Sequence, residues 1–172
     1  MLRVMTRAPK KTASAPRSSS RRIVFLLVPP VDELDLVGPL QVFNSINRLA
    51  GRPIYSMEVV TNSERLQLAG EGGVLTFMAR QHFRELKGSC DSVLLVCGLG
   101  SRSVRDAELS AWLKKTAGTV RRVGAVCVGA FLLAIYAAFP AGTFSLTAAL
   151  RGPFRVRALV RVRCPRTGRP LR

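Results

Sequence analysis

Cys127 is the residue best suited to nucleophilic chemistry. It lies between the apolar segment 123–126 and the small residues Gly129 and Ala130. This order predicts a sharp strand-to-helix turn that holds the cysteine side chain in the open. The positive end of the following helix would lower the pKa of the thiol and favour the thiolate, and the backbone N–H of Val128 could receive an oxyanion. The alternative is a buried cysteine that acts as a small apolar residue.

The segments around this cysteine alternate between strand and helix patterns. Unbroken apolar runs are typical of strands covered on both faces, and apolar residues at a helical period indicate helices. We expect strands at 23–28, 55–61, 92–96 and 123–126, a hairpin at 66–69 and 74–77, and helices at 34–49, 106–117 and from 129. The expected fold class is α/β, a sandwich with a mainly parallel sheet.

In such folds, ligands bind beyond the carboxyl ends of the strands. The loops after three of the expected strands would share one edge of the sheet. Asp35, Gly98 and Cys127 come from these loops or from the helix start beside them. Their convergence therefore predicts a site. For Asp35 the alternative is a helix N-cap, because it directly precedes the helical pattern, and a shift by one residue would bring in Asp32 or Glu33 instead.

The positive charge of the chain lies mainly in its two ends. Lys and Arg number 27 against 10 Asp and Glu, which gives a formal net charge of +17. Residues 1–22 hold seven of the basic groups and residues 151–172 hold eight, without any acid in either segment, so the part between them is nearly neutral. Without aromatic interleaving or a DNA-binding motif, these tails would attract nucleic acid only weakly and without sequence preference.

The cysteine and histidine content argues against a metal site. The four cysteines form no CxxC pair and His82 is the only histidine, so neither a zinc site nor another metal or cofactor is expected. His82 is expected at the surface beside a helix. Segment 123–150 has no charged residue and is long enough for a membrane span, but its Gly, Pro, Ser and Thr residues favour a protein without one.

Three segments together resemble the DJ-1/PfpI superfamily. They are 28–43 (VPPVDELDLVGPLQVF), 91–98 (DSVLLVCG) and 123–131 (VGAVCVGAF). Within the superfamily they are most similar to the class I glutamine amidotransferase-like domain at the N-terminus of GlxA-type AraC-family transcription regulators. Isocyanide hydratases resemble the same stretches. The resemblance covers residues 23–134.

This resemblance implies a flavodoxin-like fold, usually dimeric, with Cys127 at the elbow, Asp35 facing it and the Gly98 backbone lining the pocket. A carboxylate beside a thiolate is strained by like charge, so the pair would share a proton and could move it during attack on an electrophilic carbon. Two departures argue against an enzyme: hydratase-like members usually carry Thr where this chain has Val128, and no histidine follows Cys127.

The expected organisation has three parts. Residues 1–22 read as a disordered basic tail, 23–134 as a partial DJ-1/PfpI-like domain, and 135–172 as an aberrant tail rich in Arg, Ala and Pro. Segment 135–172 contains no Asp, Glu, Lys, Asn, Gln, His, Met or Trp, which suggests a reading-frame change near codon 135. The C-terminal part of the fold and the DNA-binding helix-turn-helix would then be missing.

The predicted function is a small-molecule effector-sensing domain of an AraC-family regulator, cytoplasmic and homodimeric in intact relatives. DNA contact would need the missing domain or, weakly, the basic tails. One alternative is a hydratase or amidase-like enzyme that uses Cys127 and Asp35. Another is a basic protein associated with nucleic acid through its tails.

Overall fold

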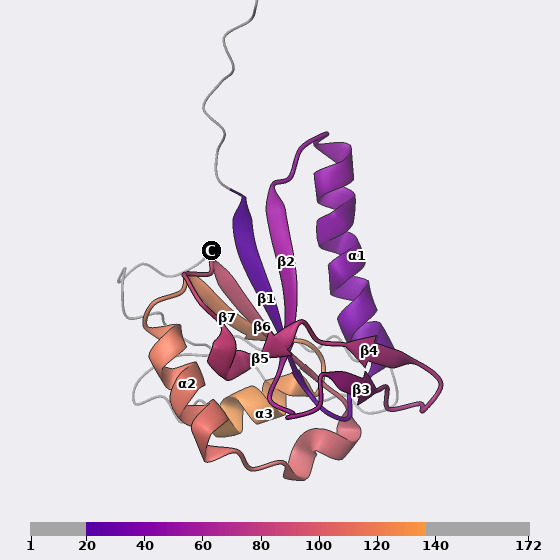
Figure 1. The fold of residues 1–172 in the computed structure, drawn as a ribbon, viewed down its shortest axis with the longest axis vertical. Coiled ribbons are helices and arrows are strands. Elements are labelled where there is room, and N and C mark those ends of the chain that lie inside the picture. Colours follow the sequence, from indigo (N-terminus) through magenta and orange to yellow (C-terminus); the bar gives the residue numbers. More distant parts are fainter. Residues whose placement is uncertain (1–19, 137–172) are drawn as a thin grey trace, which may run out of the picture.

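The computed structural model describes residues 20–136 of the 172 in the chain. Strands and helices alternate, with a hairpin and two short 3-10 helices between them (Figure 1). The strands are β1 (Arg21–Val28), β2 (Tyr55–Thr61), β3 (Gln67–Ala69), β4 (Thr76–Met78), β5 (Gln81–His82), β6 (Ser92–Cys97) and β7 (Arg122–Ala125). The helices are α1 (Glu33–Leu49), η1 (Phe83–Glu85), η2 (Leu99–Ser103), α2 (Ala107–Ala117) and α3 (Gly129–Tyr136).

Five strands form one sheet in the order β5-β2-β1-β6-β7, and every neighbouring pair is parallel. β1 is central, with Val28 opposite Cys97 on β6. On β6, Leu95 lies opposite Ala125 of β7. The carboxyl ends of β1, β6 and β7 therefore meet at one edge, as the sequence predicts. β3 and β4 form a separate antiparallel hairpin.

Alternate residues of the central strands supply two apolar layers. Val24, Leu26 and Val28 belong to a cluster with apolar residues of α2 and α3, whereas Phe25 and Leu27 belong to a cluster on the α1 side. Figure 1 shows α1 on one face of the sheet and α2 with α3 on the other. A parallel sheet covered on both faces explains the unbroken apolar runs in the sequence. The predicted α/β class with a mainly parallel sheet is confirmed.

Several details differ from the sequence-based expectation. β1 begins at Arg21, two residues earlier than predicted, because Arg21 and Arg22 already pair with β2. The short edge strand β5 and the two 3-10 helices were not predicted. His82 was expected at the surface, but it lies in β5 with 6% exposure and its ring packs on Phe83 with centroids 4.6 Å apart.

None of the helices in residues 20–136 is long and apolar enough to cross a membrane. The basic tail up to residue 19, and residues 137–172 of the predicted aberrant tail, lie outside the described residues. The nucleic-acid alternative and the frame-change hypothesis depend mainly on those segments.

Candidate active site at the carboxyl edge of the sheet

Cys127 lies in the turn between β7 and α3 and is exposed. Its φ is 48°, and it is the only residue other than glycine with a positive φ in the described part of the chain. A left-handed conformation is unfavourable for a residue with a Cβ and is often found where a site requires it. The structure thus has a turn with an exposed cysteine between β7 and α3, and a nucleophile elbow at Cys127 stays a prediction.

Gly129 allows this turn to close. A Cβ at Gly129 would lie 2.8 Å from the carbonyl oxygen of Leu95, a contact too short for any real side chain. The turn is completed by backbone hydrogen bonds from Gly129 N–H to Val126 (2.9 Å) and from Ala130 N–H to Cys127 (3.2 Å). Because Gly129 has no side chain, the start of α3 can lie close to β6, and this close approach sets the position of the preceding turn and its thiol.

Asp35 lies in the first turn of α1 and is half-buried. The N-cap of that helix is Asp32, whose Oδ1 accepts hydrogen bonds from the backbone N–H groups of Leu34 (3.0 Å) and Asp35 (3.3 Å). The N-cap alternative considered for Asp35 is therefore wrong. Its side chain is left for another role, and its Oδ2 is buried without a well-formed hydrogen bond to any described residue.

The carboxyl of Asp35 and the thiol of Cys127 influence each other. Burial raises the pKa of Asp35, as do the negative charges of Asp32 and Glu71, while the Cys127 thiol lowers it by acting as a hydrogen-bond donor. Burial also raises the pKa of Cys127, followed by the charge of Asp35, and the backbone N–H of Val128 opposes this rise. The two side chains thus form an interacting pair.

The predicted lowering of the Cys127 pKa is wrong. The N–H of Val128, at the start of α3, acts in the predicted direction, but burial and the Asp35 carboxylate outweigh it. The sequence argument considered the helix end without the desolvation of the thiol. Cys127 therefore carries less thiolate at neutral pH than an ordinary exposed cysteine.

Gly98 is the N-cap residue of η2 and lies in the loop after β6. Its backbone N–H donates to the carbonyl of Pro30 (2.6 Å). A Cβ at this position would overlap the carboxylate of Glu71 and lie 3.1 Å from the Pro30 carbonyl. Gly98 therefore leaves space for the Glu71 side chain, and its own N–H is already used in the hydrogen bond to Pro30.

Glu71, in the β3–β4 turn, was missed by sequence reasoning. Its Oε2 accepts a hydrogen bond from Leu99 N–H and its Oε1 accepts one from Gly100 N–H, both at 2.8 Å. The Gly-Glu-Gly-Gly sequence of the turn indicated a hairpin but gave no sign of where the carboxylate would lie. Only the tertiary structure brings it to the loop after β6.

Glu33 is also tied to the hairpin, since its Oε1 accepts a hydrogen bond from Gly72 N–H (3.0 Å). Asp32 is used as the cap of α1. The two acids named as substitutes for Asp35 thus have structural partners of their own.

The thiol of Cys97, at the end of β6, is buried. Burial, together with the charges of Asp35 and Cys127, raises the pKa of this thiol to about 12.

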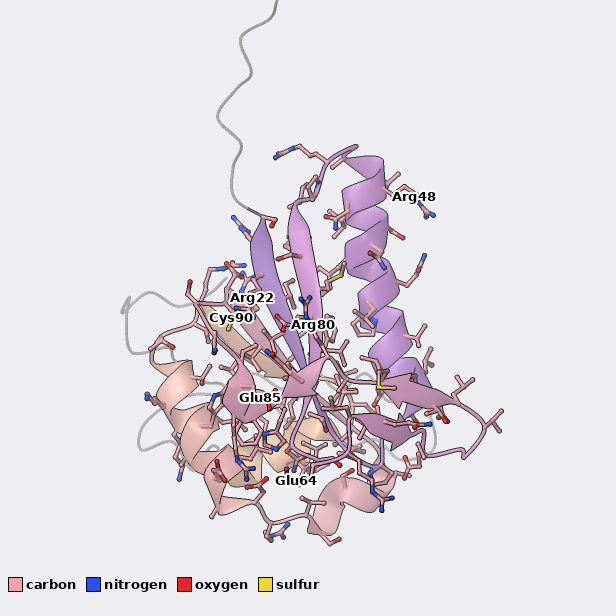
Figure 2. The ribbon with its side chains drawn as sticks, viewed as in Figure 1. Arg22, Arg48, Glu64, Arg80, Glu85 and Cys90 are labelled. Atoms are coloured by element: carbon pink, nitrogen blue, oxygen red, sulfur yellow. The ribbon has the colours of Figure 1, made fainter. Side chains whose placement is uncertain are left out.

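A hollow lies apart from these residues. It has a volume of about 510 Å³ and is lined by Arg22, Glu58, Arg80, Gln81, Glu85 and Lys87. Figure 2 labels Arg22, Arg80 and Glu85, which come from β1, the β4–β5 segment and η1. Charges of both signs surround this hollow, and the Arg22 Nη2 is 2.6 Å from Glu58 Oε2. None of the predicted site residues lines it.

The arrangement at the sheet edge defines a class: an α/β protein with a parallel sheet and an exposed cysteine on a left-handed turn beside an acid. Sequence comparison gives the family. The sequence model of the DJ-1/PfpI family matches residues 21–147, and the chain belongs to this family. The match runs beyond residue 134, where the predicted family-like segment ends. No curated protein sequence matches the chain.

Solved structures agree on the fold. A ThiJ/PfpI family protein from Pseudomonas syringae superposes with a TM-score of 0.60 at 18% sequence identity. The superposition covers 80% of this chain and 55% of the Pseudomonas syringae protein. An AraC family transcriptional regulator from Pseudomonas putida gives a TM-score of 0.54 at 16% identity, and the superposition covers 60% of this chain and 55% of the regulator. Oxidized DJ-1 from Toxoplasma gondii gives 0.53 at 16% identity, with 68% and 61% covered. The chain thus spans less than two thirds of the length of each.

Within residues 20–136 no cluster of His, Cys, Asp or Glu is arranged to hold a metal ion. The acids around Cys127 face helix caps, hairpin amides and the thiol itself. The chemistry that this edge offers is therefore that of a thiol, a carboxyl and backbone N–H groups.

Proposed function

We propose that this chain is a ligand-sensing domain of a transcription regulator and that Cys127 and Asp35 form its small-molecule site. The observation that carries the proposal is the buried Oδ2 of Asp35, which lacks a well-formed hydrogen bond and lies in a carboxyl that interacts with the exposed Cys127. Leaving such an atom unpaired costs about 1–3 kcal/mol. A ligand that donates a hydrogen bond to it would recover part of that cost.

The electrostatics favour sensing over catalysis. An activated cysteine nucleophile needs a lowered pKa or a neighbouring base, whereas the pKa of Cys127 is raised by burial and by Asp35. The single histidine of the sequence, His82, lies beside Glu64 with its Nε2 4.0 Å from Glu64 Oε1. Val128 has no hydroxyl that could donate to an intermediate.

The assignment to a regulator is supported by the likeness to the AraC family regulator and by the GlxA-type motifs of the sequence. DNA binding would then be the role of a helix-turn-helix domain, and the 172 residues show no helix-turn-helix pattern. A cytoplasmic homodimer is the form that the family resemblance implies. The effector would be a small molecule with a hydrogen-bond donor for Asp35.

A hydratase or amidase-like enzyme is the second candidate. It is favoured by the backbone N–H of Val128, which interacts with the Cys127 sulfur and could hold developing negative charge. In this reaction class the Cys127 thiol would pass its proton to Asp35 as the sulfur attacks an electrophilic carbon, and Asp35 would give that proton to the isocyanide carbon or to the departing amine. Water would then cleave the sulfur–carbon bond and restore the thiol.

Acetamide tests both candidates, because its NH₂ can donate to Asp35 and its carbonyl can accept from Val128. The full chain is treated with iodoacetamide at rising acetamide concentrations, and modification of each cysteine is followed by peptide mass. We expect saturable protection of Cys127 that Asp35→Ala removes, unchanged modification of Cys90, and no ammonia release. The absence of protection would overturn the proposal.

Ammonia release that Cys127→Ala abolishes would instead establish the amidase-like candidate. A parallel assay with cyclohexyl isocyanide covers the hydratase reaction, because its product is the corresponding formamide. We expect no formamide above the level of the Cys127→Ala variant.

A further inference from the structure

The amino-terminal half of the sheet carries charged side chains on a face that is apolar elsewhere. Along β1, Arg22 shares its face with Val24, which belongs to the core packed against α2 and α3. Along β2, Glu58 stands two residues before Val60 of the same core. The strand period therefore places a guanidinium and a carboxylate where apolar side chains would otherwise extend the core.

Arg22 and Glu58 both line the hollow of about 510 Å³ and are bonded to each other. Arg22 donates to Glu58 Oε2 from Nε at 3.0 Å and from Nη2 at 2.6 Å. The side-chain amide of Gln81 donates to Glu58 Oε1 at 3.1 Å. The Glu58 side chain is only 11% exposed. Its negative charge is therefore balanced within the protein and does not decide which ligand the hollow attracts.

The backbone on both sides of the hollow is held to neighbouring strands of the sheet. Arg22 Nη1 donates to the carbonyl of Lys87 at 2.5 Å. A Cβ at the following residue, Gly88, would lie 3.5 Å from that Nη1, so the guanidinium packs against this turn. The backbone N–H of Arg80 donates to the carbonyl of Val59 at 2.8 Å. Lys87 is thus anchored to β1 and Arg80 to β2, which pair with each other.

Three charged groups that line the hollow have no partner among the described residues. The guanidinium of Arg80, the ammonium of Lys87 and the carboxylate of Glu85 take part in no hydrogen bond or ion pair within residues 20–136. Arg22 uses its Nε–H and one N–H of each Nη, which leaves the second N–H of each Nη. The hollow therefore offers two unpaired cations against one unpaired acid.

We propose that this hollow binds the phosphate group of a small molecule, held by Arg80, Lys87 and the remaining N–H groups of Arg22. A phosphate monoester carries a charge of about −1.5 to −2 at neutral pH, which matches the two unpaired cations. Guanidinium groups donate paired hydrogen bonds to phosphate oxygens, and an ammonium binds phosphate as a point charge.

The size of the hollow fits a whole small molecule, since small-molecule sites usually measure about 300–1,000 Å³. None of the residues that line it belongs to the Cys127–Asp35 site. The phosphate site is therefore a second site, and it does not depend on the proposed function. Acetamide protection of Cys127 and phosphate binding are separate measurements, so the failure of one leaves the other standing.

The test measures binding of inorganic phosphate to the full chain by NMR, from the backbone amide signals of Arg80, Gln81 and Lys87. Phosphate replaces chloride at constant ionic strength, so that general screening stays the same. We expect saturable shifts of these signals. The dissociation constant should rise about tenfold in Arg80→Gln and in Lys87→Gln, because each variant removes a charge-assisted hydrogen bond.

Arg48→Gln is the matched control, because it removes the same charge at another place. Arg48 lies in the last turn of α1, and Figure 2 shows it apart from the labelled residues that line the hollow. The chain has a formal net charge of +17, so it attracts phosphate in a general way as well. We expect Arg48→Gln to bind phosphate as the unaltered chain does. Equal weakening in Arg48→Gln and Arg80→Gln, or unchanged binding in Arg80→Gln and Lys87→Gln, would overturn the proposal.

Glu85→Gln tests the same site with the opposite sign and keeps both cations. Because the Glu85 carboxylate repels an anion, this variant should bind phosphate more tightly than the unaltered chain. Unchanged or weaker binding would contradict the proposal. Arg80, Glu85 and Lys87 are all exposed, so their replacement should leave the urea unfolding midpoint nearly unchanged, and each variant can be measured in its folded form.

Discussion

Asp35 and Cys127 act on each other in opposite directions. The carboxylate of Asp35 raises the pKa of the Cys127 thiol, whereas the thiol lowers the pKa of Asp35 by donating to it. Burial raises the pKa of both groups, and the carboxyl, whose ordinary pKa is far lower, ionises before the thiol. Protonated sulfur beside a carboxyl is suited to binding a polar ligand reversibly, and this order of ionisation underlies the first two predictions.

Asp35→Asn should make Cys127 more reactive at a given pH. The variant removes the charge that raises the pKa of the thiol, so its alkylation profile with iodoacetamide should move to lower pH. Stopped alkylation followed by peptide mass measures the profile. Cys90 is the internal control, since Asp35 is not among the groups that act on it. An identical profile for Cys127 in both proteins would contradict the prediction.

Asp35→Asn should also stabilise the fold at neutral pH. Because the pKa of Asp35 is raised on folding, its stabilising contribution is complete below the unfolded pKa and is lost as pH rises through the folded value. We expect a gain in the free energy of unfolding at pH 7, because the variant removes a carboxylate whose charged form the fold disfavours. Urea unfolding at pH 7 and below pH 4 measures it. A gain that is no smaller in acid would contradict this cause.

The turn at Cys127 can be tested with two substitutions that both remove the thiol. Glycine adopts a φ of 48° freely, whereas alanine retains the steric cost of a Cβ. Cys127→Gly should therefore be more stable to urea than Cys127→Ala by about 1 kcal/mol. If alanine is equally stable, the left-handed turn does not hold in solution.

Gly98→Ala should destabilise the chain, because the new methyl group meets the Glu71 carboxylate and the Pro30 carbonyl. The expected loss is about 1–3 kcal/mol. Glu71→Ala removes one of these obstacles, so the double variant should lose less than the sum of the two single changes. Strict additivity in a double-mutant cycle would show that Gly98 and Glu71 do not meet.

Most of the fold was predictable because the sheet is parallel and covered on both faces. The runs 23–28 and 93–97 are uninterrupted in apolar residues, which is typical of a strand covered on both faces. β5, with two residues, is too short to leave such a pattern. His82 was misplaced for the same reason, since its burial depends on Phe83 and on the edge pairing of β5 with β2.

The site was predictable as far as it depends on the order of the elements. The turn at Cys127 follows from an apolar strand, a cysteine and nearby small residues, and the position of Asp35 at the start of α1 follows from the order of β1 and α1. The pKa of Cys127 was not predictable, because it depends on how much water the fold removes. Glu71 was not predictable either, since its carboxylate reaches Leu99 across 28 positions of the chain.

The central position of β1 bears on how the chain folds. Its register pairs Ile23 with Met57 of β2 on one side and with Ser92 of β6 on the other, and β7 pairs with β6 in turn. Such distant closures are slow compared with helix formation. During synthesis α1, which carries Asp35, leaves the ribosome well before Cys127, so the two side chains can meet only after the chain has been made past β7.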